Sequence, residues 1–258
     1  METSNDLYQV RLGRKPMLWD NRHYRLANFI TSDMTRQAAA LTAKEWSLGK
    51  ILDQGNTPHC VGFAWAGWGI CEPVVDNFTN DDGNRIYYEA KVIDGEPNQE
   101  DGSSTLSGVK AMRQDGRLQN YAFATTLDDM VTWLLTQGPV VVGTNWYQQM
   151  FNPDANGVVT ISGNVAGGHE HLIVGVDKNT QQFKHANSWG TGWGSGGFFY
   201  LSFADEQRLQ NENGDACTAV ELAQGPTPPP GPTPPPQPGG CGKALGDWLP
   251  PVIARKLQ

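Results

Sequence analysis

Apolar residues in the first half of the chain follow patterns typical of helices. The run Cys60-Val61-Gly62-Phe63-Ala64-Trp65-Ala66-Gly67-Trp68 is apolar or small at every position, which predicts a buried central helix from Cys60 to about Val75. Each glycine within this stretch costs about 1 kcal/mol in helix propensity relative to alanine. Packing against other elements must therefore hold the helix together.

Further helices are predicted downstream of this segment. Two of them cover residues 84–93 and 104–114. A third follows an N-cap at Thr126, carries Asp128 and Asp129 in its first turn, and ends at Gly138-Pro139. The predicted helices thus all lie before residue 140.

After residue 139 the hydrophobic pattern changes to that of strands. The predicted strands cover residues 140–143, 157–161, 171–176, 182–186 and 198–201. Helices followed by strands indicate an α+β chain with two lobes, a helical lobe and a lobe of antiparallel strands.

The N-terminal region differs from the predicted domain, which covers residues 46–223. Residues 1–45, the N-terminal arm, contain Arg11-Leu12-Gly13-Arg14-Lys15-Pro16 and then a polar, moderately helical stretch. Two roles stay open for this arm. It either wraps the domain or acts as a short autoinhibitory or docking segment.

The C-terminal region has two parts. Residues 224–240 are a proline-rich linker that favours extended polyproline II conformation. The tail, residues 241–258, carries several apolar side chains, among them Trp248 and Ile253. A spacer followed by a small amphipathic tail suggests docking to a larger partner, and a disordered end is the alternative.

Composition and charge argue against several classes of partner. The 258 residues include 18% charged and 38% hydrophobic residues, and the net charge is −8. Without a long basic run, a nucleic-acid partner is not expected. No apolar stretch approaches ~20 residues, so no membrane span is expected. The polar, acidic start Met1-Glu2-Thr3-Ser4-Asn5-Asp6 is not a secretory signal.

Cysteine usage points to a reducing compartment. The four cysteines, Cys60, Cys71, Cys217 and Cys241, are too few and too scattered for a disulfide framework. They form no CxxC pair, which argues against a zinc site. Reduced thiols are expected throughout, and a single bridge such as Cys217–Cys241 remains open.

Cys60 is a candidate nucleophile. It follows a turn-rich loop, residues 53–59, and opens the apolar helix. Near a helix N-terminus, the macrodipole and unpaired backbone N–H groups lower the pKa of a thiol, and the thiolate is the reactive form. A cysteine at a helix start is by itself more often structural, so the assignment depends on its partners.

Two histidines compete for the role of base. His169 follows Gly167-Gly168 and opens an apolar strand, and His171 lies two residues further on. Because strand side chains alternate, both share one face about 6–7 Å apart. The same alternation turns Glu170 to the opposite face, where we expect it to be solvated.

Asn187 opens the run Asn187-Ser188-Trp189-Gly190-Thr191-Gly192-Trp193-Gly194, 18 residues after His169. Gln54 lies six residues before Cys60. The order Gln54, Cys60, His169, Asn187, together with this run, resembles the papain-like cysteine peptidases over roughly residues 46–222.

The resemblance implies a papain-like two-lobed fold, with Cys60 on the helical lobe and His169 and Asn187 on the strand lobe. It assigns His169, rather than His171, as the base that takes the Cys60 proton. Asn187 would orient the imidazole, and Gln54 would donate to the oxyanion beside the Cys60 backbone N–H. No cofactor or metal ion is implied.

The resemblance also implies where substrate binds. Glu100-Asp101-Gly102-Ser103-Ser104 is similar to the strip that hydrogen-bonds an extended substrate backbone in the family. Trp189 would shield the histidine–asparagine bond from water. The implied substrate contacts are Gly102, Ser103, Gly168 and Trp189. Family members choose substrates mainly through a pocket for the side chain second from the scissile bond, whose walls the sequence does not identify.

The chain departs from the family pattern beside the nucleophile. Pro58-His59 precede Cys60 where relatives usually have Gly followed by Ser or Cys, and Val61 follows where Trp is usual. The triad does not need the Val61 side chain. We expect His59 to be an exposed loop residue, with perturbation of the thiol or contact with substrate as the alternative.

The function implied by this resemblance is that of a cysteine endopeptidase acting on a protein or peptide through an acyl-thioester. A catalytically silent structural or binding module, and another amide acyl transfer on the same triad, remain as alternatives. The compact chain with few cysteines and a tail is similar to bacterial and bacteriophage members. A virion- or assembly-associated protease, cytoplasmic or carried in the virion, is the expected setting.

Overall fold

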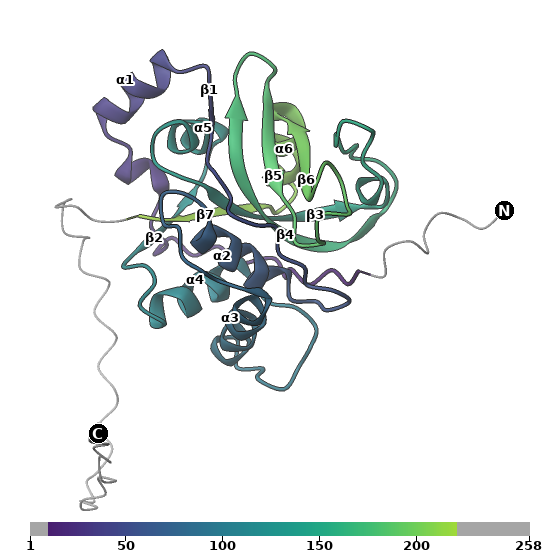
Figure 1. Cartoon of the computed structure of the whole chain (residues 1–258). Helices are drawn as coiled ribbons and strands as arrows, with labels where there is room; N and C mark the ends of the chain where they lie inside the picture. The colour runs from purple at the N-terminus through teal and green to yellow at the C-terminus, as the bar shows by residue number, and fades with distance from the viewer. Residues whose placement is uncertain (1–9, 221–258) are drawn as a thin grey trace, which may run out of the picture. The chain divides into compact units, whose positions relative to one another are not determined.

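One antiparallel sheet forms the centre of the fold (Figure 1). The computed structural model describes residues 10–220. The strands follow the order β2-β7-β3-β4-β5-β6, and β1 pairs with β4. Their bounds are Ala43–Glu45 (β1), Tyr121–Ala124 (β2), Val140–Tyr147 (β3), Val165–Asp177 (β4), Gln182–Ala186 (β5), Phe198–Ser202 (β6) and Asp215–Ala219 (β7).

The helices fall into groups around this sheet. Helices α2, α3 and α4 pack on one another, and α2 also packs on β4 (Figure 1). Helix α1 packs on α5, and α6 packs on β6 and β3. The α-helices are Ser32–Ala40 (α1), Cys60–Ile70 (α2), Asn80–Ile93 (α3), Thr105–Gln114 (α4), Leu127–Thr136 (α5) and Phe203–Asn211 (α6), with 3-10 helices at Leu26–Phe29 (η2) and Gln148–Phe151 (η3).

Helix α2 is buried at all of its 11 positions. A helix that is apolar all round needs protein on every side, and α3, α4 and β4 supply it here. Its Gly62 lies so close to α3 that a Cβ there would come within 2.1 Å of the Gly83 carbonyl oxygen. The predicted requirement for tertiary packing is therefore met by close backbone approach.

Several helix boundaries follow the predicted signals. The Thr126 hydroxyl accepts a hydrogen bond from the Asp129 backbone N–H at 3.1 Å, as expected of an N-cap for α5. Ser104 caps α4 in the same way, through the Ser107 backbone N–H at 3.2 Å. Helix α2 ends at Ile70 rather than near Val75, because Cys71 adopts extended backbone and Pro73 cannot continue a helix.

The predicted strand at residues 157–161 is wrong. Val158 forms an isolated bridge to Tyr200, and the rest of the segment is loop. Its alternation instead reflects burial of Val159 and Ile161 in a cluster around Trp146. The pattern identified buried side chains correctly but not backbone pairing.

Sequence patterns also missed short elements. Strands β1, β2 and β7 and helix α6 were not predicted, and β3 and β4 are longer than predicted. Helix α1 lies in the stretch of the N-terminal arm that was described as moderately helical. β4 extends because its N-terminal part pairs with β3 and its C-terminal part with β1. The part of the N-terminal arm that the structure describes lies on the domain, with α1 against α5.

The predicted domain boundaries stay a prediction. The linker and tail at residues 224–258 lie outside the described residues, as does Cys241. Cys60, Cys71 and Cys217 are free and buried. Among residues 10–220, no helix is long and apolar enough to cross a membrane.

Two glycines of α2 provide a matched test of its packing. We expect Gly62→Ala to lower the free energy of unfolding by about 1–3 kcal/mol, because the added methyl collides with α3 backbone. Gly67→Ala should be neutral or stabilising by up to about 1 kcal/mol, since its Cβ would meet Leu172 Cδ2 at 3.7 Å. Urea denaturation measures both. Equal destabilisation by the two substitutions would contradict the close α2–α3 contact.

Candidate active site

Cys60 is the first residue of α2 and is fully buried. Its thiol lies near the backbones of Glu170, Gly13 and Val61. Glu170 directly follows His169 on β4, so the thiol lies against the strand that carries the predicted base. Gly13 belongs to the N-terminal arm, which therefore also reaches the thiol.

His169 and Asn187 form a direct hydrogen bond. The His169 Nε2 and Asn187 Oδ1 atoms are 2.8 Å apart. The same Oδ1 accepts the Ser188 backbone N–H at 2.8 Å, which fixes the amide so that its oxygen faces the ring. Nε2 must then be the donor, and in the neutral ring Nδ1 carries the lone pair. Among the described residues Nδ1 has no hydrogen-bond partner.

Aromatic rings surround the His169 imidazole. Trp189 lies with its ring centroid 4.7 Å from that of His169, and the Trp146 ring approaches at 4.9 Å. Both tryptophans are buried, at 5% and 0% exposure. Trp189 thus lies where it was expected to shield the His169–Asn187 bond, and Trp146 adds a second wall that sequence reasoning did not identify.

His171 has different neighbours. Its Nδ1 is 3.1 Å from His185 Nδ1, and its Nε2 is 3.4 Å from the Thr144 hydroxyl. His185 in turn lies 3.8 Å from a carboxylate oxygen of the buried Glu206. Burial lowers the pKa of His171 well below its usual value, so the ring is neutral. These contacts place His171 in a core polar cluster, separate from Asn187.

Glu170 is not solvated, contrary to the expectation. It is completely buried and accepts a hydrogen bond from the Thr105 hydroxyl at 2.8 Å. Strand alternation did turn it away from His169, but that face of β4 is also covered. Burial, together with the nearby charge of Asp215, raises the pKa of Glu170 well above its usual value.

His59 is not an exposed loop residue either. It is 3% exposed and is the N-cap position of α2. Its ring stacks on Tyr87 with centroids 3.9 Å apart, and its Nδ1 is 2.8 Å from Asn84 Oδ1. These contacts tie the loop before Cys60 to α3.

Gln54 is buried beside the loop that precedes Cys60, and its amide is fully engaged. The Oε1 atom accepts from the Ser188 hydroxyl at 2.7 Å. The Nε2 atom donates to the Thr57 carbonyl at 2.6 Å and to the Arg11 carbonyl at 3.1 Å. The predicted oxyanion donor thus already binds two peptide carbonyls, one of which belongs to the N-terminal arm.

Residues 11–15, which we call the covering segment, lie across the predicted site. The Ser103 N–H donates to the Gly13 carbonyl at 2.8 Å, and the Lys15 N–H donates to the Ser103 carbonyl at 2.7 Å. On the other side, the Arg14 N–H donates to the Gly168 carbonyl at 2.9 Å. Ser103 and Gly168, both predicted to contact substrate, therefore bind the chain's own backbone.

Glycines permit this close approach. A Cβ at Gly102 would lie 2.1 Å from the Gly13 carbonyl oxygen, and one at Gly168 would lie 2.2 Å from that of Arg14. Conversely, a Cβ at Gly13 would lie 1.9 Å from the Pro58 carbonyl oxygen. Side chains at these positions would keep a peptide backbone from lying between the two walls.

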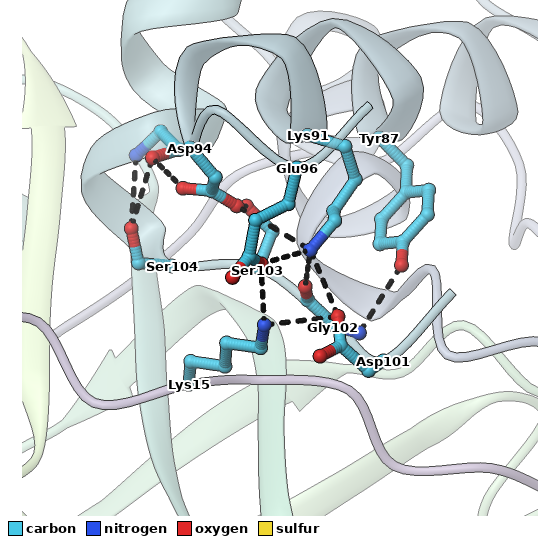
Figure 2. A network of polar contacts seen from close by, with 10 residues as sticks. Lys15, Tyr87, Lys91, Asp94, Glu96, Asp101, Gly102, Ser103 and Ser104 are labelled. Atoms are coloured by element: carbon cyan, nitrogen blue, oxygen red, sulfur yellow. Dashed lines mark hydrogen bonds and ion pairs between the residues drawn. The ribbon is translucent and has the colours of Figure 1, made fainter. Parts of the chain in front are cut away.

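A buried lysine organises the strip at Gly102 and Ser103 (Figure 2). The Lys91 ammonium donates to the Gly102 carbonyl at 3.0 Å and to Asp101 at 2.8 Å. The Ser103 hydroxyl donates to Asp94 at 2.7 Å. This network fixes the loop so that the Ser103 N–H and carbonyl both face the covering segment, and its contribution was not evident from the sequence.

The covered site holds a neutral thiol and a neutral imidazole. Burial raises the pKa of Cys60 to about 12. Burial also lowers the pKa of His169 to about 4, against the opposing effect of the Asn187 hydrogen bond. The lowered thiol pKa expected from the helix N-terminus is therefore not found in this arrangement, because desolvation outweighs the helix dipole.

Comparison with known proteins identifies the family of the chain. A model of the papain family of cysteine proteases matches residues 75–219, which is more than half of the chain. The chain belongs to the papain family. The matched range includes His169 and Asn187, whereas Gln54 and Cys60 precede it.

Curated relatives of the papain family match part of the chain. Cathepsin B-like cysteine proteinases 6 and 5 of Caenorhabditis elegans are 35% identical over 70 residues and 33% identical over 83 residues. These matches cover 26% and 31% of this chain and 18% and 24% of the relatives. The chain thus matches less than a quarter of the length of either relative.

Solved papain-family structures share the fold. Xylellain, a cysteine protease from Xylella fastidiosa, superposes with a TM-score of 0.65 at 18% identity, over 83% of this chain and 98% of that one. Procathepsin B S9 from Trypanosoma congolense gives a TM-score of 0.58 at 13% identity, over 82% and 86%. The predicted papain-like α+β fold is confirmed.

The covering segment should control access to Cys60. We expect Gly13→Val to raise the iodoacetamide labelling rate of Cys60 by about tenfold or more. The added side chain collides with the Pro58 backbone. Overpacking costs about 1–3 kcal/mol, which shifts the equilibrium between the covered and the uncovered arrangement by about tenfold or more. Mass spectrometry at pH 8 measures the rate.

Matched controls separate this effect from unfolding. Arg11→Ala removes an exposed side chain that contacts the Glu100 carbonyl and should change the rate little. The buried Cys71 and Cys217 should stay unlabelled in both variants. An unchanged Cys60 rate in Gly13→Val would show that residues 11–15 do not cover the thiol in solution.

Proposed function

We propose that the chain is a cysteine endopeptidase that uses Cys60 as nucleophile, His169 as base, Asn187 to orient His169, and Gln54 as oxyanion donor. The observation that carries the proposal is the hydrogen bond from Gln54 Nε2 to the Arg11 carbonyl at 3.1 Å, in a segment whose Gly13 backbone reaches the Cys60 thiol. A peptide backbone with a carbonyl at this donor is what peptide-bond cleavage requires.

The chemistry would follow from these positions. His169 Nδ1, which holds the lone pair, takes the Cys60 proton, and the thiolate attacks the scissile carbonyl carbon. The resulting oxyanion accepts hydrogen bonds from Gln54 Nε2 and the Cys60 backbone N–H. When the C–N bond breaks, His169 gives its proton to the leaving amine and an acyl-thioester remains. Water, deprotonated by His169, then releases the acid and restores the thiol.

The covering segment would make the described arrangement a latent one. Residues 11–15 exclude water from Cys60 and His169, and burial is the main cause of both pKa shifts. Displacement of the segment readmits water, so the pKa of the thiol falls and that of the imidazole rises. The helix N-terminus can then stabilise the thiolate, and the ion pair needed for attack forms.

Alternative functions differ in what they require of these residues. A silent binding module would not need a lone pair at His169 Nδ1 or an aligned Gln54. Another amide acyl transfer would use the same acyl-thioester with a different acceptor. The bacteriophage setting, the cytoplasmic or virion location and a docking partner for the tail stay predictions from the sequence.

Single substitutions in the Gly13→Val background test the assignment. We expect Cys60→Ala to abolish peptide cleavage, and His169→Ala to lower kcat/KM by about 10²–10⁴-fold. Gln54→Ala should lower kcat by about 10²–10³-fold, the usual effect of losing one oxyanion donor. Asn187→Ala should cost less than His169→Ala, because orientation contributes less than proton transfer. Steady-state kinetics on a quenched peptide library measures each effect.

His171→Ala is the matched control for the base. It removes a neighbouring strand histidine from the core cluster and should lower thermal stability more than it lowers kcat/KM. If His171→Ala in a folded sample proved as damaging to cleavage as His169→Ala, the assignment of the base would be wrong. Detectable cleavage by Cys60→Ala would refute the nucleophile.

A further inference from the structure

The side chain of Arg14 fills an enclosed space beside Cys60, which we call the Arg14 pocket. Its walls are Thr105 of α4, Gly143 of β3, Glu170 of β4 and Asp215 of β7. The Arg14 side chain is 0% exposed and that of Asp215 is 6% exposed. Arginine is rarely buried to this extent unless it is paired.

The guanidinium of Arg14 has two partners at the end of this pocket. Its Nη2 donates to the Asp215 carboxylate and to the Asn213 carbonyl, the latter at 2.6 Å. A charged donor with a buried carboxylate makes a strong hydrogen bond, and removing one member leaves an uncompensated buried charge. The pocket thus provides a negative group where an arginine side chain ends.

Gly143 gives the pocket its depth. A Cβ at this position would lie 2.8 Å from Arg14 Nε, 2.9 Å from Asp215 Oδ1 and 2.7 Å from the Thr105 hydroxyl oxygen. Its backbone lies in an ordinary strand, so conformational freedom is not the reason for glycine here. The absent side chain leaves the room that the guanidinium occupies.

Glu170 adds a second carboxyl group to the wall. Glu170 accepts a hydrogen bond from Thr105, and its raised pKa favours the neutral acid. Asp215 is the carboxylate that pairs with the guanidinium. Burial raises the pKa of Asp215, while the Arg14 charge acts in the opposite direction. A neutral and a charged carboxyl side by side avoid the repulsion that two carboxylates would have.

The backbone contacts of Arg14 show how a peptide residue enters this pocket. The Arg14 N–H is bound by the Gly168 carbonyl, and the flanking Gly13 and Lys15 are bound by Ser103. These walls are the ones proposed above to hold substrate. Any peptide that replaces the covering segment between Ser103 and Gly168 would therefore direct one side chain toward Asp215.

We propose that the Arg14 pocket selects an arginine side chain of the peptide substrate, with Asp215 as the specificity-determining residue and Gly143 providing the space. This rests on the proposed peptidase function. The covering segment occupies the pocket as a stand-in for such a substrate.

The neighbouring basic residue makes a different kind of contact. Lys15 pairs with Glu96 and Asp101 (Figure 2), each at 2.9 Å, but its side chain is 36% exposed. Exposed pairs contribute little because water competes with them. A charged substrate side chain in the place of Lys15 should therefore affect the choice of substrate much less than a guanidinium in the Arg14 pocket.

Peptide cleavage by the full chain with Arg14→Ala tests the selection. The substrates are fluorogenic peptides in which one arginine moves through the sequence, each matched by a peptide with norleucine at that place. At one position, kcat/KM should be at least about tenfold higher for arginine than for norleucine, since a site built for hydrogen bonds rejects an analogue that lacks them. The Gly13→Val background provides the same test if Arg14→Ala does not fold.

Two further substitutions assign the effect to the pocket. Asp215→Asn should bring the arginine-to-norleucine ratio close to 1 at that position, and Gly143→Ala should lower cleavage of the arginine peptide. Glu96→Gln removes one carboxylate from the exposed pair and should keep the ratio. A ratio near 1 at every position with Asp215 intact, or a ratio unchanged by Asp215→Asn, would overturn the pocket while leaving the peptidase proposal standing.

Binding distinguishes failure of the pocket from failure of catalysis. If no peptide is cleaved, the Cys60→Ala, Arg14→Ala chain is titrated with the same peptides by calorimetry. Tighter binding of an arginine peptide than of its norleucine partner, by at least about tenfold, would support the pocket without catalysis. Equal affinities would refute it.

Discussion

The burial of helix α2 on all sides is the constraint on which the site depends. Such a helix has no solvent face, so its position is fixed by α3, α4 and β4 together. Its first residue, Cys60, is therefore held against β4, where His169 and Glu170 follow one another. The glycines that weaken α2 as an isolated helix allow the backbone contact that fixes it, and the cost in propensity is offset by packing.

The location of Cys60 has two opposed effects on the pKa of its thiol. The helix N-terminus favours a thiolate, whereas exclusion of water favours the thiol. With residues 11–15 in place, exclusion of water prevails and both Cys60 and His169 are neutral. In the proposed peptidase, the covering segment would therefore suppress Cys60 by desolvation as well as by blocking access, and its removal would reverse both.

The positions that the structure brings together as expected from the sequence depend on local pattern. Cys60 opens a buried helix, His169 lies on strand β4, and Asn187 directly follows the hairpin of β4 and β5. Their spacing along the chain was therefore enough to predict that His169 and Asn187 meet. The prediction that Glu170 is solvated was wrong, because alternation shows which face of a strand a side chain is on but not what covers that face. The Arg14–Asp215 pair joins residues 201 positions apart, and no local pattern records such a contact.

If the Arg14 pocket holds both the covering segment and the arginine of a substrate, the inactivity of the covered enzyme and its selectivity for arginine are coupled. The covering segment is tethered, and a short tether gives an effective concentration of the order of millimolar, which a free substrate must overcome. Deep recognition of arginine strengthens the bound segment and the bound substrate alike, so improving the pocket alone does not help a substrate to displace the segment. Contacts that only the segment makes can be weakened without loss of selectivity. Leu12 makes such a contact, because it packs beside Gly167 and the buried cluster that contains Trp146 and Trp189, outside the Arg14 pocket. Release of the segment and recognition of substrate can therefore be adjusted separately, although they use the same groove between Ser103 and Gly168.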